Sequence, residues 1–122
     1  MPSNWKQSLG RWGEDIAANF LKMRGYTILA QNKHIGHAEV DVLAQKDDEL
    51  VFVEVKTRSS SVYGQPEEAV DNRKLTHLIE AAQRYVIEEQ SDLPWRIDVI
   101  AITGNPNTNT EPEIVWYENV AL

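Results

Sequence analysis

The chain has 122 residues, 42% of them hydrophobic, which allows one domain with one modest core, and it has no cysteine, which excludes disulfides and thiolate metal sites. The formal net charge of -7 argues against strong nucleic-acid binding, but residues 1–58 are balanced with eight basic and eight acidic residues, so the acid excess lies in residues 59–122. With neither a leader pattern nor a long apolar run, we expect a cytoplasmic protein that does not contact a membrane.

Helical periodicity predicts an amphipathic first helix that Ser3 or Asn4 can cap and that ends before Gly25. Its apolar stripe recurs at spacings of three and four residues and comprises Trp5, Leu9, Trp12, Ile16 and Phe20. Glu14 lies on the flank of this stripe. Its carboxylate could therefore reach a site at the edge of the helix.

Three strands are predicted next. Residues 26–31 alternate as a short strand, residues 32–37 form a polar connection, and strands over residues 38–45 and 49–57 form a hairpin around a charged turn. Residues 58–65 are expected to be a loop, and Pro66 suits the first turn of a second helix that ends near Gln90. The Arg73-Lys74 pair of this helix is expected on a solvated face.

Two further strands complete the chain, over residues 95–102 and 114–117, with a loop between them. The element order αβββαββ predicts an α/β fold with a mixed sheet, in which the helix between strands three and four makes these two strands parallel. We expect a single domain over residues 1–122 with a core at about residues 4–102. Asp98 lies in an apolar strand, where it is expected to pair with a cation or to lie near the edge of the site.

The hairpin register follows if Asp47 and Asp48 are the two central turn residues, so that Lys46 faces Glu49. One face of the ribbon is then aliphatic, with the pairs Ala44–Val51, Val42–Val53 and Val40–Val55. The other face changes from apolar to charged with distance from the turn, with the pairs Gln45–Leu50, Leu43–Phe52, Asp41–Glu54 and Glu39–Lys56. A three-residue loop would shift the pairs and spoil this separation by face.

The opposed pair Asp41 and Glu54 predicts a metal site. Two carboxylates about 5 Å apart repel by roughly 3 kcal/mol at an effective dielectric near 20, and Lys56 offsets part of this repulsion. A divalent cation between them would turn the repulsion into ligation by the oxygen donors that Mg²⁺ prefers, with Mn²⁺ as an alternative. A metal that polarises a phosphate and activates a water, together with a lysine, suits phosphodiester hydrolysis.

Asp41, followed after a turn by Glu54-Val55-Lys56, matches the D…(D/E)xK signature of the restriction-endonuclease-like superfamily. A wider pattern over roughly residues 9–102 resembles the YraN-type family of small bacterial proteins. It comprises Gly13-Glu14-Asp15-Ile16-Ala17-Ala18, Gly25-Tyr26, Glu39-Val40-Asp41, Phe52-Val53-Glu54-Val55-Lys56-Thr57-Arg58 and Gly64-Gln65-Pro66. The family is similar to archaeal Holliday-junction resolvases, which implies a restriction-endonuclease-like three-layer fold with a central mixed sheet flanked by helices.

Carried over to these positions, the resemblance implies site roles for seven residues. Glu14, Asp41 and Glu54 would be the acidic metal-site residues, and Lys56 the catalytic lysine. The supporting residues near the site would be Glu39, Thr57 and Arg58.

The leading hypothesis is a metal-dependent endonuclease-like protein that hydrolyses DNA, including branched or structured DNA, through a metal-activated water. The alternative is a non-catalytic module that keeps the nuclease fold and contacts a protein partner through its acidic second half. RNA remains an alternative substrate, because recognition of the 2′-hydroxyl leaves no motif of this kind. A homodimer is expected if two strands are cut symmetrically.

Two histidines of the polar connection, His34 and His37, resemble a transition-metal pair. No third nitrogen ligand is near them in the sequence, and His77 is distant along the chain. We therefore interpret them as phosphate contacts or as solvent-exposed side chains.

Overall fold

A computed structural model describes residues 5–59 and 72–121, and within them the element order is αβββαββ. The elements are α1 (Trp5–Lys22), β1 (Thr27–Ile35), β2 (Ala38–Lys46), β3 (Glu49–Arg58), α2 (Asn72–Glu88), β4 (Trp95–Thr103) and β5 (Glu113–Tyr117). The five strands form one sheet in the order β1-β2-β3-β4-β5, in which β3 and β4 are parallel and the other neighbours antiparallel. The expected α/β class and mixed sheet are confirmed.

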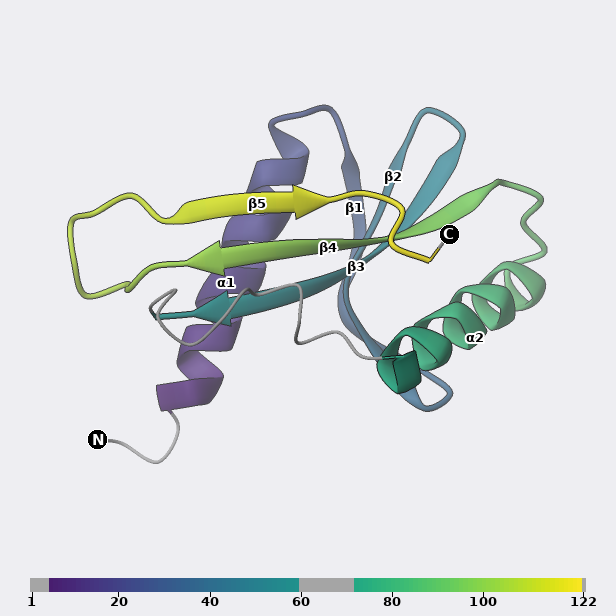
Figure 1. Ribbon diagram of the computed structural model, residues 1–122. Coiled ribbons are helices and arrows are strands. Elements are labelled where there is room, and N and C mark those ends of the chain that lie inside the picture. Colours follow the sequence, from purple (N-terminus) through teal and green to yellow (C-terminus); the bar gives the residue numbers. More distant parts are fainter. Residues whose placement is uncertain (1–4, 60–71, 122) are drawn as a thin grey trace.

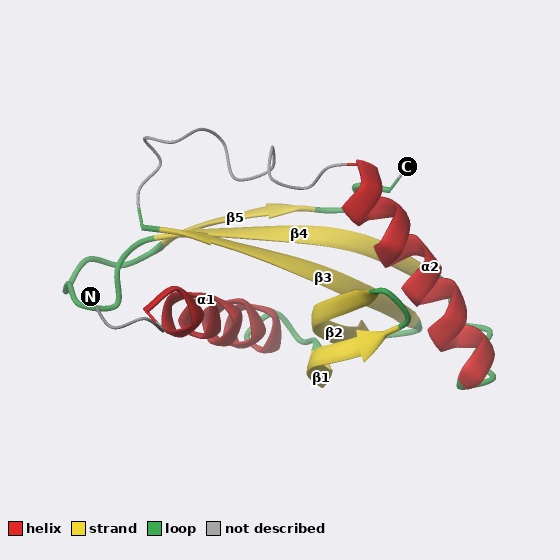
Figure 2. Cartoon of the chain, turned by 90° about the horizontal axis from the view of Figure 1, so that it is seen from below, coloured by secondary structure: helices red, strands yellow, loops and turns green. Residues whose placement is uncertain are grey.

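Alternation along β3 separates two apolar clusters on the two faces of the sheet. Val51, Val53 and Val55 belong to the cluster that includes α1, whereas Leu50 and Phe52 belong to the cluster that includes α2. In Figure 2, α1 lies along one side of the sheet, well separated from α2. The arrangement is therefore helix, sheet, helix, as expected.

The predicted ends of the helices lie partly outside the described residues. The proposed caps Ser3 and Asn4, the loop over residues 60–65 and the proposed helix start at Pro66 all fall there. Neither of the two helices that the structure describes is long and apolar enough to cross a membrane.

The first strand is longer than the sequence suggested. β1 continues to Ile35, which pairs with Ala38, so most of the expected connection over residues 32–37 is strand and the turn shrinks to Gly36 and His37. Local composition was misleading because β1 is an edge strand, where one side of the backbone and one face tolerate polar residues. A register shift beside Leu29 adds a one-residue bulge that the alternation did not reveal.

The β2–β3 hairpin has the predicted turn, but its strands separate earlier than expected. Lys46 pairs with Glu49, and the ladder continues to Val42 and Val53. Beyond that point β2 and β3 no longer pair with each other, while β2 stays paired with β1 and β3 with β4. Figure 1 makes this divergence visible, since β1 and β2 run steeply across the view while β3, β4 and β5 run nearly horizontally.

The divergence corrects the outer part of the predicted register. Within the described residues, the expected pairs Asp41–Glu54, Val40–Val55 and Glu39–Lys56 are not ladder pairs. The carboxylate of Asp41 instead accepts a hydrogen bond of 2.8 Å from the Val55 N–H. A side chain thus satisfies a backbone donor where the strands part, and it is fixed there by that bond.

Candidate metal centre

Three carboxylates converge where β2 separates from β3. Oxygen atoms of Glu14, Glu39 and Asp41 all lie within 4.8 Å of one another. Glu14 comes from α1, and the other two come from alternate positions of β2. We call these three residues the acidic cluster. The predicted acids Glu14 and Asp41 are therefore neighbours in space, and Glu39, expected to have a supporting role, lies among the possible ligands.

Glu14 reaches the cluster because α1 packs unusually close to β3. A Cβ atom on Gly13 would overlap the side chain of Thr57, so a residue without a side chain is needed at this crossing. Thr57, expected to be a supporting residue, contributes this packing surface. Asn32 of β1 makes a hydrogen bond with the Glu14 side chain. The helix position and this bond together orient the Glu14 carboxylate.

Glu54 lies beside the cluster and is almost fully buried, with 2% of its surface exposed. Its Oε1 atom forms ion pairs with Lys74 and, at 3.6 Å, with Lys56. Its Oε2 atom is the buried side-chain oxygen that has no hydrogen-bond partner among the described residues. An orphaned buried carboxylate oxygen is costly, and a bound cation would satisfy it.

The protonation properties of the site reflect this shortage of positive charge. Burial, and next the negative charge of Glu54, raise the pKa of Asp41 to about 8, although the Val55 N–H opposes the shift. Burial also raises the pKa of Glu14, with further contributions from neighbouring carboxylates against the opposing hydrogen bond to Asn32. These acids lack sufficient cations of their own, which is the condition that a divalent ion would relieve.

The two lysines at Glu54 influence each other. Burial lowers the pKa of Lys56, and the adjacent Lys74 lowers it further, while the carboxylates Glu54 and Asp41 oppose this. Burial is likewise the largest influence on Lys74 and acts to lower its pKa, but the hydrogen bond with Glu54, the contact with Lys56 and the negative charges of Glu54 and Asp41 together outweigh burial and leave the pKa raised. Lys56 is thus placed next to the acids with a weakened hold on its proton.

Lys74 is a residue of the site that the sequence pattern does not predict. It was expected on a solvated face of the second helix, but it forms an ion pair with buried Glu54. A signal was available, because Lys74 stands four residues before Leu78, which is buried, and residues at this spacing share one face of a helix. What the spacing could not give is the partner, since α2 and β3 meet only in the folded structure.

Two cavities flank the acidic cluster. One, of about 680 Å³, lies between the start of α1 and the end of β3 and is lined by Glu14 together with Trp5, Lys6, Lys56 and Arg58. The other, of about 240 Å³, is lined by Glu39, Asp41 and Glu54 together with His37, Lys74 and His77. Since each cavity contains part of the cluster, the acids lie between them. Arg58, expected to support the site, lines the first.

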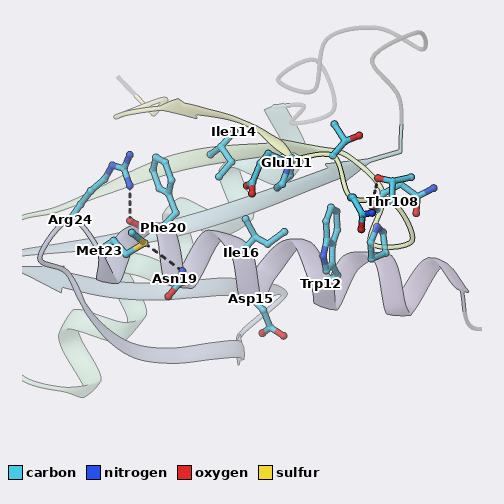
Figure 3. A pocket seen from close by; sticks show the side chains of 15 residues that line it. Trp12, Asp15, Ile16, Asn19, Phe20, Met23, Arg24, Thr108, Glu111 and Ile114 are labelled. Atoms are coloured by element: carbon cyan, nitrogen blue, oxygen red, sulfur yellow. Dashed lines mark hydrogen bonds between the residues drawn. The ribbon is translucent and has the colours of Figure 1, made fainter.

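A larger cavity of about 730 Å³ lies elsewhere, between α1 and the segment that joins β4 to β5. Figure 3 shows Trp12, Ile16, Phe20 and Ile114 along its apolar side, with Asp15 and Glu111 among its polar groups. The described residues that line it include no member of the acidic cluster. The chemistry expected from the sequence is therefore concentrated at the smaller cavities.

Comparison with known proteins agrees with the resemblance noted in the sequence. Residues 13–102 match the model of a family described as "Uncharacterised protein family UPF0102". A "UPF0102 protein" of Syntrophomonas wolfei is 50% identical over 97 residues, which cover 79% of this chain and 84% of the relative. A "UPF0102 protein" of Bacteroides thetaiotaomicron is 46% identical over 96 residues, covering 79% of each chain. The matched region contains every residue of the acidic cluster and both lysines at Glu54.

Proposed function

The chain belongs to the UPF0102 family, and from its acidic cluster we propose that it is a metal-dependent, nuclease-like phosphodiester hydrolase acting on DNA, including branched or structured DNA. The supporting observation is the convergence of Glu14, Glu39 and Asp41 within 4.8 Å, beside the orphaned Oε2 atom of Glu54. This arrangement is the reason for preferring an enzyme with a metal over a charged surface patch.

The residues present fit a divalent cation of the Mg²⁺ or Mn²⁺ type. All the candidate ligands are carboxylate oxygens, which are the donors that these hard cations prefer. Asp41 and Glu14 have raised pKa values because they are buried among other acids, and a cation would favour their ionised forms. Asp41, Glu54, Glu14 and Glu39 would hold the ion. When bound, it would supply Lewis acidity toward the phosphate and lower the pKa of a water.

Lys56 would act on the reacting groups. Its ammonium lies 3.6 Å from Glu54 and lines the cavity on the α1 side of the cluster. From there it can orient the attacking water or stabilise the negative charge that develops on the phosphate. Glu54 holds Lys56 in place by that ion pair, and Lys74 shares the same carboxylate. The carboxylate of Asp41 is positioned by the hydrogen bond that it accepts from the Val55 N–H.

Calorimetry and a nuclease panel test the proposal together. We expect the wild-type protein to bind Mg²⁺ or Mn²⁺, and Asp41→Ala and Glu54→Ala to lose this binding. Cleavage of single-stranded, duplex and branched DNA, with RNA as a further substrate, should fall at least about 100-fold in Lys56→Ala. The control is Lys22→Ala, which removes an exposed lysine from the last turn of α1. A wild-type protein that binds neither metal would refute the proposal, and cleavage that survives Lys56→Ala would point to a contaminant.

The acid excess of residues 59–122, eleven acidic against four basic residues, favours one alternative function. This alternative is a non-catalytic module that keeps the fold and contacts a protein partner through its acidic half. Metal binding without cleavage of any substrate in the panel would favour it. A wild-type protein that cleaves, with activity lost in Lys56→Ala, would exclude it.

A further inference from the structure

The turn between β1 and β2 lies against α2, and two cavities meet at their contact. The cavity of about 240 Å³ reaches Asp41 and Glu54, and a second cavity of about 200 Å³ reaches Arg84. His37 and His77 line both cavities. We call these two cavities together the α2 groove. It leads from the acidic cluster along α2.

A pair of histidines forms the middle of the α2 groove. The ring centroids of His37 and His77 are 5.6 Å apart with planes inclined by 35°. The two residues are far apart in the sequence, so the sequence alone provides no reason to group His77 with His37, but the fold brings them together. Among the described residues, one group of three side chains is close enough to share a metal ion. That group is the acidic cluster, and it contains neither histidine. Each imidazole can instead donate a ring N–H to an anion, whether it is neutral or charged.

Cations stand at both ends of the groove. Lys74 lies at the cluster end, and Arg84 lies at the far end with its Nη1 atom 3.5 Å from the place a Cβ on Gly36 would take. Lys74 and Arg84 are ten positions apart in the helix, which is about 15 Å along α2 at roughly 1.5 Å per residue. That is the axial length of about four phosphates of one duplex strand. Donors are thus spaced along a path that begins at the proposed metal site.

Acidic groups also face this path. Glu39, Asp41 and Glu54 line the cluster end, where a bound cation would offset them, and Glu80 lines the far cavity. Arg84 also forms an ion pair with Glu88, in which its Nε atom lies 2.8 Å from the Glu88 carboxylate. Counting the described residues that line it, the far half of the groove therefore holds two imidazoles and one guanidinium against one facing carboxylate.

We propose that the α2 groove binds the sugar–phosphate backbone of the substrate strand beside the bond that is cut. His37 and His77 contact a phosphate next to the acidic cluster, and Arg84 contacts a phosphate further along. Contacts of this kind fix the position and direction of a strand without reading its sequence. The inference rests on the proposed function, because it names further substrate contacts of the same site. It also accounts for how an acidic chain can hold DNA, since the donors are local even though the net charge is negative.

Binding without cleavage is the decisive measurement. Fluorescence anisotropy with a short fluorescein-labelled DNA, single-stranded and duplex, is recorded in Ca²⁺ in place of Mg²⁺. We expect the dissociation constant to rise about three- to tenfold in His37→Asn/His77→Asn and in Arg84→Gln, because each change removes hydrogen bonds to a phosphate. Glu80→Gln should tighten binding, and Lys22→Gln should leave it unchanged. His37→Asn alone alters an exposed turn residue, so its effect is measurable even if the double variant is unstable.

The outcomes separate this inference from the proposed function. Unchanged DNA affinity in the histidine and arginine variants overturns the groove, even if the wild type cleaves DNA in Mg²⁺. Weakened affinity in these variants supports the groove, even if no cleavage is found. Calorimetry with Zn²⁺ covers the competing occupant: zinc binding that requires both histidines, with DNA affinity unaffected, would identify a metal site there and refute phosphate binding.

Discussion

Two buried carboxylates, Glu54 and Asp98, lie one step apart in the same pair of parallel strands. Asp98 pairs with Val53 in the β3–β4 ladder, and Glu54 pairs with Val99. Because successive side chains alternate, the two acids face opposite sides of the sheet. Both are shielded from solvent, with exposures of 0% for Asp98 and 2% for Glu54. Their surroundings differ completely.

Asp98 is fully provided with donors. Its carboxylate receives two bonds from the Nε atom of Arg96, at 3.0 and 3.2 Å, one of 2.8 Å from the Trp116 indole and one of 2.9 Å from the Asn119 backbone. The expected pairing of Asp98 with a cation is thus confirmed. Glu54 has lysines at one oxygen and, among the described residues, no partner at the other.

The contrast distinguishes an acid that holds the fold together from one that is prepared for a ligand. A buried carboxylate with donors at both oxygens has its desolvation offset and needs nothing more. A buried carboxylate with an orphaned oxygen, set among other acids, weakens the protein until something binds. Such a local cost is expected at functional sites. Four changes test the comparison, three in order of decreasing effect and one whose effect depends on pH.

The largest effect is expected from Asp98→Ala. The change removes the acceptor of the Trp116 and Asn119 N–H groups and one of the three carboxylates that pair with the largely buried guanidinium of Arg96, so the free energy of unfolding should fall by about 3–5 kcal/mol. Urea denaturation measures this. Asp92→Ala, at an exposed acid, should change it by less than about 0.5 kcal/mol. Mg²⁺ affinity should be unaffected at temperatures where the variant is folded, and a loss of affinity there would place Asp98 in the site after all.

Gly13→Ala should have the next largest effect, because it separates α1 from β3 where the two are closest. The overlap with Thr57 should lower the free energy of unfolding by about 1–3 kcal/mol, and the displaced Glu14 should weaken Mg²⁺ binding. Gly10→Ala is the matched control, since a Cβ there has nothing within 4 Å and alanine favours a helix by about 1 kcal/mol. Thr57→Ala in the Gly13→Ala background should restore part of the loss. Equal effects at both glycines would show that packing at Thr57 is unimportant.

Local pattern was sufficient for much of the fold. The hairpin turn at Asp47 and Asp48, its inner pairs and the parallel β3–β4 arrangement follow from alternation and from the single helix between two strands. The length of β1 and the separation of β2 from β3 did not follow. Both depend on how far each pair of neighbouring strands stays hydrogen-bonded, which is decided by tertiary packing. The hydrogen bond from Val55 to Asp41 that marks the separation joins a side chain to a distant backbone group, which periodicity does not encode.

The site was predictable to a similar degree. Asp41 and Glu54 could be grouped because they stand on one face of a hairpin, and Glu14 could be placed at a helix edge. Lys74 and His77 could not, because α2 meets β2 and β3 only through tertiary packing. The contact of Asn32 with Glu14 could not be predicted for a different reason. Asn32 lies in a segment expected to be a loop, and it has a positive φ of 53° inside an edge strand.

Glu54→Gln tests the other half of the comparison and should have a smaller effect on stability than Asp98→Ala. An amide keeps one oxygen for Lys74 and puts a donor near Asp41, so we expect the free energy of unfolding without metal to change by less than about 1 kcal/mol. The stabilisation that Mg²⁺ gives to the wild type, read as a rise in melting temperature, should be lost. A Glu54→Gln variant as damaged as Asp98→Ala would mean that both acids are structural.

Asp41→Asn should have no effect on stability in acid and an effect that grows as the pH rises. The pKa of Asp41 is raised from 3.8 to about 8 in the folded protein, so between these values the folded state keeps a proton that the unfolded state has released. The stability contributed by this proton is complete below about pH 4 and is lost as the pH rises toward 8. In metal-free buffer, Asp41→Asn should therefore gain stability over the wild type between about pH 5 and pH 8, while Asp47→Asn, in the exposed turn, should not. If the stabilities of all three proteins change equally with pH, the raised pKa of Asp41 is contradicted. If added Mg²⁺ raises the stability of the wild type at about pH 8 but not that of Asp41→Asn, the cost of ionising Asp41 is relieved by the metal.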